Sequence, residues 1–509
     1  MADIPLAVSP TVRTPGTFLS VDLKAGAPSP GTGTQRALII GLKSSSGTIT
    51  EDTQLVQGVS GEAQVSDLFG PGTPTHLGAK RLFEEYGIAQ VDVVCAAAAS
   101  GSAATGTITF ASSPTADRVI TGTIAGRVIK SDWYSGETAI QGATRLVTQI
   151  NAQGNDLPVT AANGGGTLAV VTLTFKHNGA VGNDCYFYAE ISGSGAGSVT
   201  ASASKLSGAA AEPSWVNALA LAAGREYHII LICASNADTV TATTTGAPGR
   251  LKTHIELYKT GIFAKLQSAL LGCTDATNAS LKTGAAAQNY ERLDYVIARE
   301  GQSLPFEFAC AEAGSRLREQ AKNPNRNRIG TVYVSTLYGP KSLVSGMPSG
   351  TEVEDDLQSG IGCIAYDESG RPFITRPITS YFKTAQGAAD DRVLDVPRRV
   401  STDYVARDLA TFIETSWPNM NIIDTTDVLE GQDFPEGCVT IQEISDGVAG
   451  RMEAHILRGI VRRSKFKEAL DNGSFVCRIN PTDGGQVDLV VPASIVRHLA
   501  KKSLVVQQR

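Results

Sequence analysis

The stretch that decides the fold is Arg36–Leu42, RALIIGL, a short apolar run of the kind that favours a buried strand. A helical pattern follows at His76–Tyr86, where Leu77, Leu82, Phe83 and Tyr86 share one face and Gly87 ends the helix. Val91–Cys95, VDVVC, predicts the next strand. Strand, helix and strand in close order predict a βαβ unit, and therefore an α/β core domain.

The β–α alternation is interrupted from residue 99 to about residue 207, where Gly, Ala, Ser and Thr dominate. Short alternating segments at Gly106–Phe110, Asp117–Ile124 and Leu168–Phe175 predict strands of a small all-β insertion domain. The alternation then resumes, and the expected elements are a helix opened by Pro213 and closed by Gly224, strands at Tyr227–Cys233 and Leu293–Arg299, and a helix at Glu307–Gln320. The predicted core is therefore residues 34–98 plus 208–380, interrupted by the insertion at 99–207.

Residues 381–509 differ in character, and we expect them to form a C-terminal α+β domain. A charged segment runs from Glu443 to Leu470. The predicted elements are a helix at Thr402–Thr415, strands at Phe475–Ile479 and Val487–Val491, and a short helix at Ser494–Lys501.

Both ends of the chain have sequences typical of extended arms. Five prolines within residues 1–33 forbid a continuous helix, and one strand-like segment lies between them, Thr17-Phe18-Leu19-Ser20-Val21-Asp22-Leu23. The last strand-like segment is Ser503-Leu504-Val505-Val506-Gln507. A strand without a partner in its own chain suits pairing with another chain, so we expect these two segments to lie between subunits.

Composition narrows the possible functions. The 509 residues carry a formal net charge of −6, and charged residues make up only 18% of them. Nucleic-acid binders usually have a basic excess, so no direct nucleic-acid contact is expected. The eight cysteines are scattered without metal-ligand spacing, and the N-terminus does not resemble a signal peptide. No apolar run is long enough to span a bilayer, and the chain is expected to be soluble and made in the cytoplasm.

No catalytic motif supports an enzyme. The sequence has no P-loop, no dinucleotide-binding fingerprint, no HExxH and no GxSxG. The six histidines show no ligand spacing, and His228, within an apolar strand, is expected to be a satisfied core residue. The acidic cluster Glu352, Glu354, Asp355 and Asp356 favours a solvated loop over a cation site. We therefore expect no enzyme, cofactor or metal; a hydrolase on the α/β core remains an alternative without positive support.

Several short motifs, in order along nearly the whole chain, resemble the tail sheath proteins of Mu-type contractile-tailed phages. The most specific is Ile374–Tyr381, ITRPITSY, followed by Gly387, Asp390 or Asp391, and Leu394-Asp395-Val396, although Ser380 stands where Thr is usual. The other matches are Ile4-Pro5, Val12–Phe18, Ala37–Gly41, Phe69–Thr73, Asn178–Asn183 and the ending Val487–Arg509.

The resemblance implies a structural subunit that polymerises helically around a tail tube, in stacked hexameric rings, and contracts to drive the tube through the host envelope. Its implied partners are further copies of itself, the tube protein, and baseplate and terminator proteins, in a virion assembled in the host cytoplasm. The implied layout places the core and C-terminal domain near the tube and the insertion outward. Candidate tube contacts lie in the basic run: Arg458, Arg462, Arg463, Lys465 and Lys467. The sheath of a phage-derived, bacteriocin-like particle is the alternative within the same family.

Overall fold

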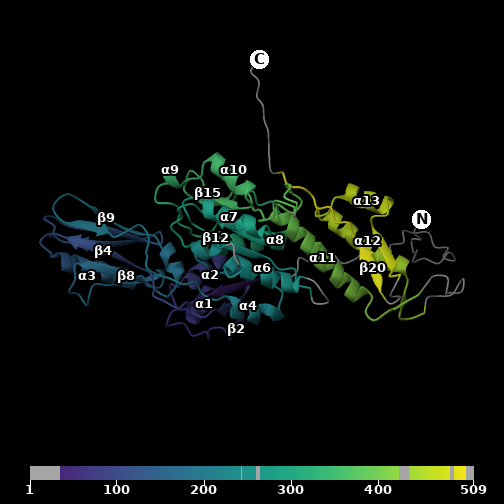
Figure 1. Cartoon of the computed structure of the whole chain (residues 1–509), viewed down its shortest axis with the longest axis horizontal. Coiled ribbons are helices and arrows are strands. Elements are labelled where there is room, and N and C mark those ends of the chain that lie inside the picture. The colour runs from purple at the N-terminus through teal and green to yellow at the C-terminus, as the bar shows by residue number, and fades with distance from the viewer. Residues whose placement is uncertain are drawn as a thin grey trace, which may run out of the picture. The chain divides into compact units, whose positions relative to one another are not determined.

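The structure is a computed structural model that describes residues 35–241, 244–259, 264–384, 386–423, 435–481 and 486–499. The described chain falls into two compact units, one of residues 35–403 with 497–499 and one of residues 404–496. Figure 1 labels the elements of both. The predicted α/β class with additional α+β parts is confirmed. The division lies inside helix α11 (Val396–Ser416), whereas the sequence placed the last domain boundary at residue 380. The domain limits given above stay a prediction.

The larger unit is built on a nine-stranded sheet with the order β14-β16-β15-β13-β12-β11-β1-β3-β2. The predicted strand at Arg36–Leu42 is β1, and it pairs in parallel with β3 on one side and β11 on the other. β1 is buried from Ala37 to Gly41 because helices cover both faces of the sheet, which is why its sequence is continuously apolar. The strands are β1 (Arg36–Gly41), β2 (Leu55–Val59), β3 (Gln90–Cys95), β11 (Ile229–Ile232), β12 (Ala269–Cys273), β13 (Leu293–Ile297), β14 (Thr331–Val332), β15 (Gly362–Tyr366) and β16 (Pro372–Ile374).

Helices α2 and α8 pack closely against each other beside this sheet. Close packing requires glycine at the contact: a Cβ at Gly314 would lie 2.6 Å from the carbonyl oxygen of Leu82. The predicted helices at 76–86 and 307–320 are thereby confirmed, each with its start two residues earlier at a proline. The helices of the core are α1 (Glu62–Phe69), α2 (Pro74–Glu85), α4 (Val216–Leu221), α5 (Asn236–Thr239), α6 (Ala247–Tyr258), α7 (Ala279–Gln288), α8 (Pro305–Lys322), α9 (Leu343–Gly346) and α10 (Gly350–Gln358).

The segment 99–207 forms two antiparallel sheets, of order β10-β4-β8-β7 and β6-β5-β9, at one end of the larger unit (Figure 1). The all-β prediction is wrong for this segment, because it also contains the helix α3 (Ala139–Ala152), which buries Leu146 and Ile150 against the strands. Its strands are β4 (Thr105–Ala111), β5 (Arg118–Ile124), β6 (Arg127–Trp133), β7 (Val159–Ala162), β8 (Val170–Phe175), β9 (Phe187–Ser192) and β10 (Ser198–Ala201), with the short 3-10 helix η1 (Ala180–Asp184).

The smaller unit, residues 404–496, packs three helices with two small sheets. Its core includes Val448, Met452 and Phe466, all buried. The elements are the second part of α11, α12 (Ile441–Leu457), α13 (Arg463–Asp471), the parallel pair β17 (Asn421–Ile422) and β18 (Cys438–Val439), and the antiparallel pair β19 (Val476–Ile479) and β20 (Val487–Val490).

The short helix predicted at Ser494–Lys501 is absent from its described part, residues 494–499. Ile495 instead forms an antiparallel bridge with Val461, and Arg462 N–H donates to the carbonyl of Ser494 at 2.8 Å. The backbone here is extended because a neighbouring segment satisfies its polar groups, which the local sequence does not reveal. Among the described residues, no helix is long and apolar enough to cross a membrane.

Candidate assembly surfaces

The most specific sequence motif, Ile374–Tyr381, has a structural role, because its side chains form hydrogen bonds with the residues that follow it. Arg376 Nε donates to Asp395 Oδ1 at 2.8 Å, and Tyr381 Oη donates to Asp390 Oδ2 at 2.9 Å. Thr379 Oγ1 donates to the carbonyl of Val393 at 3.0 Å. These bonds close the segment 374–396 into a loop, and they hold the start of α11 beside the sheet.

The same loop is fixed to the core through Ser380. Its hydroxyl donates to the carbonyl of Tyr290 at 2.9 Å and accepts from Tyr290 N–H at 3.3 Å. Its backbone N–H donates to the carbonyl of Leu293 at 3.0 Å. Serine therefore supplies the hydroxyl that this position uses, although threonine is usual in the resembling family.

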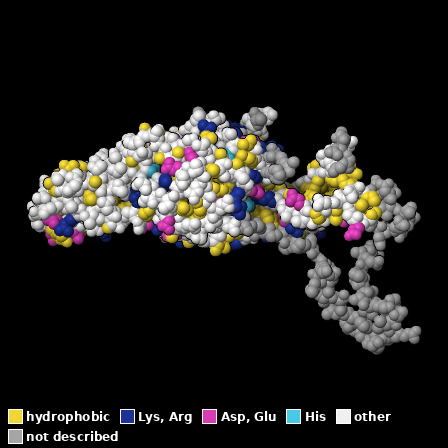
Figure 2. Space-filling model, turned by 90° about the horizontal axis from the view of Figure 1, so that it is seen from below, with side chains coloured by type: hydrophobic (Ala, Val, Ile, Leu, Met, Phe, Trp, Pro, Cys, Tyr) yellow, Lys and Arg dark blue, Asp and Glu magenta, His cyan; other side chains and the backbone are white. Residues whose placement is uncertain are grey.

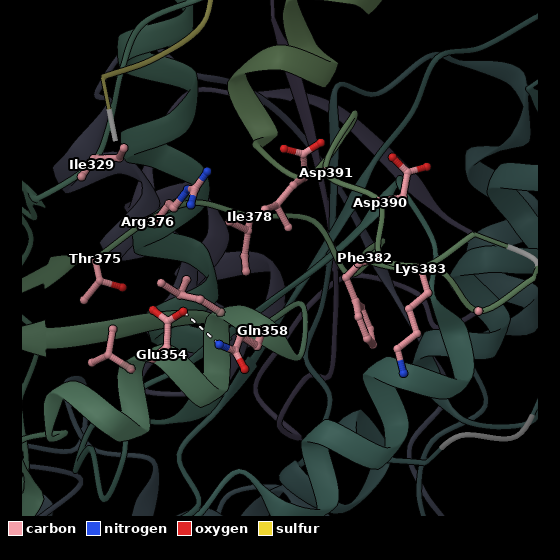
Figure 3. A pocket seen from close by; sticks show the side chains of 15 residues that line it. Ile329, Glu354, Gln358, Thr375, Arg376, Ile378, Phe382, Lys383, Asp390 and Asp391 are labelled. Atoms are coloured by element: carbon pink, nitrogen blue, oxygen red, sulfur yellow. Dashed lines mark hydrogen bonds between the residues drawn. The ribbon is translucent and has the colours of Figure 1, made fainter. Parts of the chain in front are cut away.

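An open hollow of about 860 Å³ lies against this loop (Figure 3). It is lined by apolar side chains such as Ile378 and Phe382 together with charged ones such as Glu354 and Lys383. Among the described residues, no group of three or more His, Cys, Asp or Glu side chains is arranged to hold a metal ion. Within the described chain, the hollow therefore contains no recognisable set of metal ligands.

The acidic cluster at residues 352–356 lies on helix α10, so the prediction of a solvated loop is wrong. Asp356 is buried and receives two hydrogen bonds from Arg299, at 2.6 and 2.8 Å. Asp355 pairs with Lys282, and Glu352 completes a capping box with Ser349. The cluster therefore stabilises the core and its helix start. His228 is a satisfied residue as expected, since its Nδ1 accepts from Arg36 N–H at 3.1 Å.

The smaller unit contains an apolar groove with a volume of about 230 Å³. Val487 and Leu489 of β20 line it, because alternate residues of a strand point to the same side. The remaining lining is entirely apolar: Ile413, Trp417, Met420, Ile422, Val439 and Ile444. The groove is not predicted from the sequence, although the alternation of Val487 and Leu489 indicates that one face of β20 is apolar.

The groove adjoins strands with open edges. Within the described residues, β19 and β20 pair only with each other, and β17 and β18 do likewise. The predicted strands at 475–479 and 487–491 are confirmed as this hairpin. Val490 points away from the groove and is 55% exposed. Unpaired backbone groups beside an apolar groove form a template for a further strand.

A buried ionic cluster fixes the helices behind the groove. Asp408 of α11 accepts from Arg451 at 2.6 and 2.7 Å and contacts His455 Nε2 at 2.9 Å, both from α12. Burial alone raises the pKa of the Asp408 carboxyl, but hydrogen bonds from His455 and Arg451 outweigh it, and the net pKa is lowered. Arg451 and His455 are four residues apart on one face of α12, a spacing visible in the sequence, but their partner is remote.

The five candidate tube contacts divide into two groups. Arg463 and Lys467 are exposed, lie one turn apart on α13, and make no ion pair with another described residue. Lys465 pairs with Glu468 at 2.5 Å. Arg458 is half-buried, and its Nη1 donates to Tyr404 Oη at 2.8 Å; Arg462 is also half-buried, at the N-cap of α13. On the face drawn in Figure 2, charged side chains form small scattered groups and no continuous basic stripe. The two predicted arm strands, Thr17–Leu23 and Ser503–Gln507, lie outside the described residues.

Comparison with known proteins gives one clear relative. The chain is 23% identical over 428 residues to the tail sheath protein of the Mu-like prophage FluMu of Haemophilus influenzae, covering 83% of both chains. No family model matches.

Among solved structures, the chain is similar to a sheath tail protein from Desulfitobacterium hafniense (11% identity, TM-score 0.43, 88% of this chain and 91% of the other). It is also similar to the contracted sheath of an extracellular contractile injection system (10% identity, TM-score 0.47, 98% and 99%). TM-scores below 0.5 do not by themselves establish a common fold. The relative found by sequence confirms the resemblance to phage tail sheath proteins that the ordered motifs predicted.

Proposed function

We propose that this chain is a structural subunit that polymerises into a contractile tail sheath. The observation that carries the proposal is the similarity to a prophage tail sheath protein along 83% of both chains. A structural role also agrees with the geometry of the described residues, since the motif Ile374–Tyr381 forms part of an internal loop and the groove in the smaller unit is lined by apolar side chains. Function is therefore assigned to surfaces between subunits.

The proposed joint between subunits is β-strand addition. A strand from another copy adds to the open edge of the β19–β20 hairpin, where main-chain hydrogen bonds give strength and alternate side chains give register. Leu19, Val21 and Leu23 alternate in the predicted N-terminal arm, and Leu504 and Val506 alternate in the predicted C-terminal arm. Each arm thus has an apolar face that matches the apolar groove next to β20.

Such joints allow the subunits to move while they stay connected. A strand held by main-chain hydrogen bonds keeps neighbours linked, and the predicted arms, at residues 1–33 and 503–507, act as tethers. Contraction is then a rigid-body rearrangement between two packings of the larger units, with the extended state held by a kinetic barrier. A gain of a few kcal/mol per subunit, summed over many copies, supplies the work.

The proposed partners follow from this role. The chain assembles with further copies of itself, in a helical array of stacked rings, around a tube protein and between baseplate and terminator proteins. Arg463 and Lys467 are the strongest candidates for tube contact because both are exposed. Their charge supports a grip that is sensitive to salt and therefore reversible. The insertion at 99–207 is the part proposed to face outward.

Negative-stain electron microscopy of the purified full-length chain tests the proposal. A sheath subunit is expected to form long tubes or stacked rings as its concentration rises, with no partner protein added. A chain that stays monomeric at every concentration and salt condition, and that also fails to assemble on tail tubes, contradicts the proposed function.

A further inference from the structure

Two buried clusters of ionisable side chains lie where residues 99–207 meet the α/β core, and in the first of them one glutamate pairs with two arginines. Arg127 of β6 and Arg81 of α2 both donate to Glu307 Oε2 of α8, at 2.8 and 2.9 Å. Burial raises the pKa of the Glu307 carboxyl, but the charges of Arg127 and Arg81 outweigh it and hold that pKa at about 2. The Glu307 carboxyl therefore stays ionised at any pH well above 2, and this first contact between the insertion and the core keeps its charge.

The second joint has carboxyl groups without an arginine. Asp184, the last residue of η1, accepts a hydrogen bond from Asn236 N–H at 2.7 Å. Glu212, in the segment that returns from the insertion, accepts from Ser235 Oγ at 2.5 Å. Ser235 and Asn236 follow β11, so both carboxyl groups meet the same corner of the core.

The surroundings of this corner add further negative charge. Glu212 Oε2 is buried and has no hydrogen-bond partner among the described residues. Asp238 lies nearby and receives hydrogen bonds from Trp215 Nε1 and Ala247 N–H, at 2.7 and 2.9 Å. Asp275 accepts from the Asn236 side chain at 3.0 Å. The cation that faces Asp184 is Lys205, whose ammonium group lies 4.6 Å from the ring centre of Tyr186.

We propose that this corner is a proton-controlled joint, which holds the insertion firmly on the core when Asp184 and Glu212 are protonated and loosens when both ionise. A neutral carboxyl group can be buried beside other carboxyl groups at little cost in free energy. An ionised one is destabilised there by the loss of its hydration and by repulsion from the neighbouring negative charges. The joint does not depend on the proposed sheath function, since it acts within one chain.

The expected pH range follows from the direction of the shifts. Burial raises the pKa of Asp184 to about 7, against the hydrogen bond from Asn236 and the charge of Lys205. Burial also raises the pKa of Glu212 to about 7, and the neighbouring Asp238 and Asp184 add to the effect. Both values lie above those of an unfolded chain, near 4. The stabilisation is therefore complete below about pH 4, falls as pH rises towards about 7, and stays low above it.

Hydrogen–deuterium exchange of the full-length chain tests this inference, read on peptides that cover residues 180–190 and 229–240 and corrected for intrinsic exchange. Between about pH 5.5 and pH 8.5, opening of this corner is expected to increase about tenfold or more in the unaltered chain. The double variant Asp184→Asn, Glu212→Gln keeps the size of both groups, but these two positions cannot ionise. Its opening is expected to depend much less on pH, because burial raises the pKa only of the remaining Asp238 in this corner.

The matched control is Glu190→Gln, because Glu190 also pairs the insertion with the core, through Lys341 at 2.7 Å, but both side chains are more than half exposed. This control is expected to keep the pH dependence of the unaltered chain. The proposal is overturned if opening of the corner increases with pH as much in the double variant as in the unaltered chain. It is also overturned if opening does not increase with pH in the unaltered chain.

The infrared absorption of protonated carboxyl groups near pH 6 gives a second reading if the double variant folds poorly. Compared with the unaltered chain, this absorption is expected to be weaker in the single variant Glu212→Gln and unchanged in Glu190→Gln. An unchanged absorption in Glu212→Gln also overturns the proposal.

Discussion

The nine-stranded sheet of the larger unit and the β19–β20 hairpin of the smaller unit end in opposite ways. In residues 35–403, the edge strand β14 has only two residues, and the other edge, β2, is broken by an irregular register between Val56 and Val59. In residues 404–496, the β19–β20 hairpin has four regular pairs, exposes Val490 and lies beside an apolar groove. Short or irregular edge strands disfavour pairing with another chain, whereas a regular edge strand offers unpaired backbone groups to a further strand. The nine-stranded sheet thus offers no long regular edge, whereas the β19–β20 hairpin is suited to receive a strand.

The two units also differ in how their charges are used. The larger unit buries whole ion pairs, such as Arg328 with Glu312 and Arg299 with Asp356. The smaller unit has one such cluster, around Asp408, and keeps Arg463 and Lys467 exposed within the described residues. Changes in the larger unit should therefore act on stability, and changes in the smaller unit's surface should act on assembly.

The largest effect on stability is expected from Glu307→Gln in the larger unit. The substitution keeps the shape of the side chain but leaves Arg81 and Arg127 buried without a counter-charge. The free energy of unfolding of this unit should fall by about 3–5 kcal/mol. Urea denaturation measures it, with Glu190→Gln as the control, which should change it by less than about 1 kcal/mol. Equal losses in the two variants would show that the buried joint is unimportant.

An intermediate effect is expected from Asp408→Asn in the smaller unit, with a loss of about 1–3 kcal/mol. The folded pKa of Asp408 is lowered, so its contribution is present above the unfolded value, near 4, and is lost as pH falls through the folded value. The unaltered unit should therefore lose stability in acid below about pH 4, and the variant should lose less. Hydrogen exchange of α12 amides measures both. A variant with the same acid sensitivity as the unaltered chain contradicts this reading.

The smallest effect on stability is expected from charge reversal of Arg463 and Lys467 to Glu. Both side chains are exposed, so the free energy of unfolding should change by less than about 0.5 kcal/mol. Binding to the tail tube should weaken, and its dependence on salt concentration should be reduced. The matched control is Lys465→Glu, since Lys465 is already paired with Glu468. Tube binding that is unchanged in the double reversal would remove these residues from the proposed interface.

The parts of the fold that the sequence predicted are those with strong local patterns. β1, β3, α2, α8 and the β19–β20 hairpin each have a continuous or periodic apolar signal. Helix α3 was missed because its small and polar residues hid its period, although Thr138 and Gln141 form a capping box and Leu146 and Ile150 are spaced as on one helix face. The overall composition of residues 99–207 outweighed that local signal.

The remaining features of the fold could not be predicted from local sequence patterns, because the residues in contact are far apart in the sequence. Asp356 looked like part of a solvated acidic run, but Arg299, a remote residue, holds it in the core. Ile495 lies in a segment that was predicted to be helical, but its antiparallel bridge with Val461 requires an extended backbone. The groove in the smaller unit combines side chains from α11, α12 and three short strands, β17, β18 and β20, or their flanks, and only folding brings them together.

Removal of residues 1–24 tests the central claim most directly, with assembly followed by electron microscopy and folding by thermal unfolding. The account predicts a soluble chain with an unchanged unfolding midpoint that forms no tubes or rings, because it lacks the predicted strand at 17–23, which is proposed to join neighbouring subunits. Tubes of normal length and frequency from the truncated chain would contradict the account.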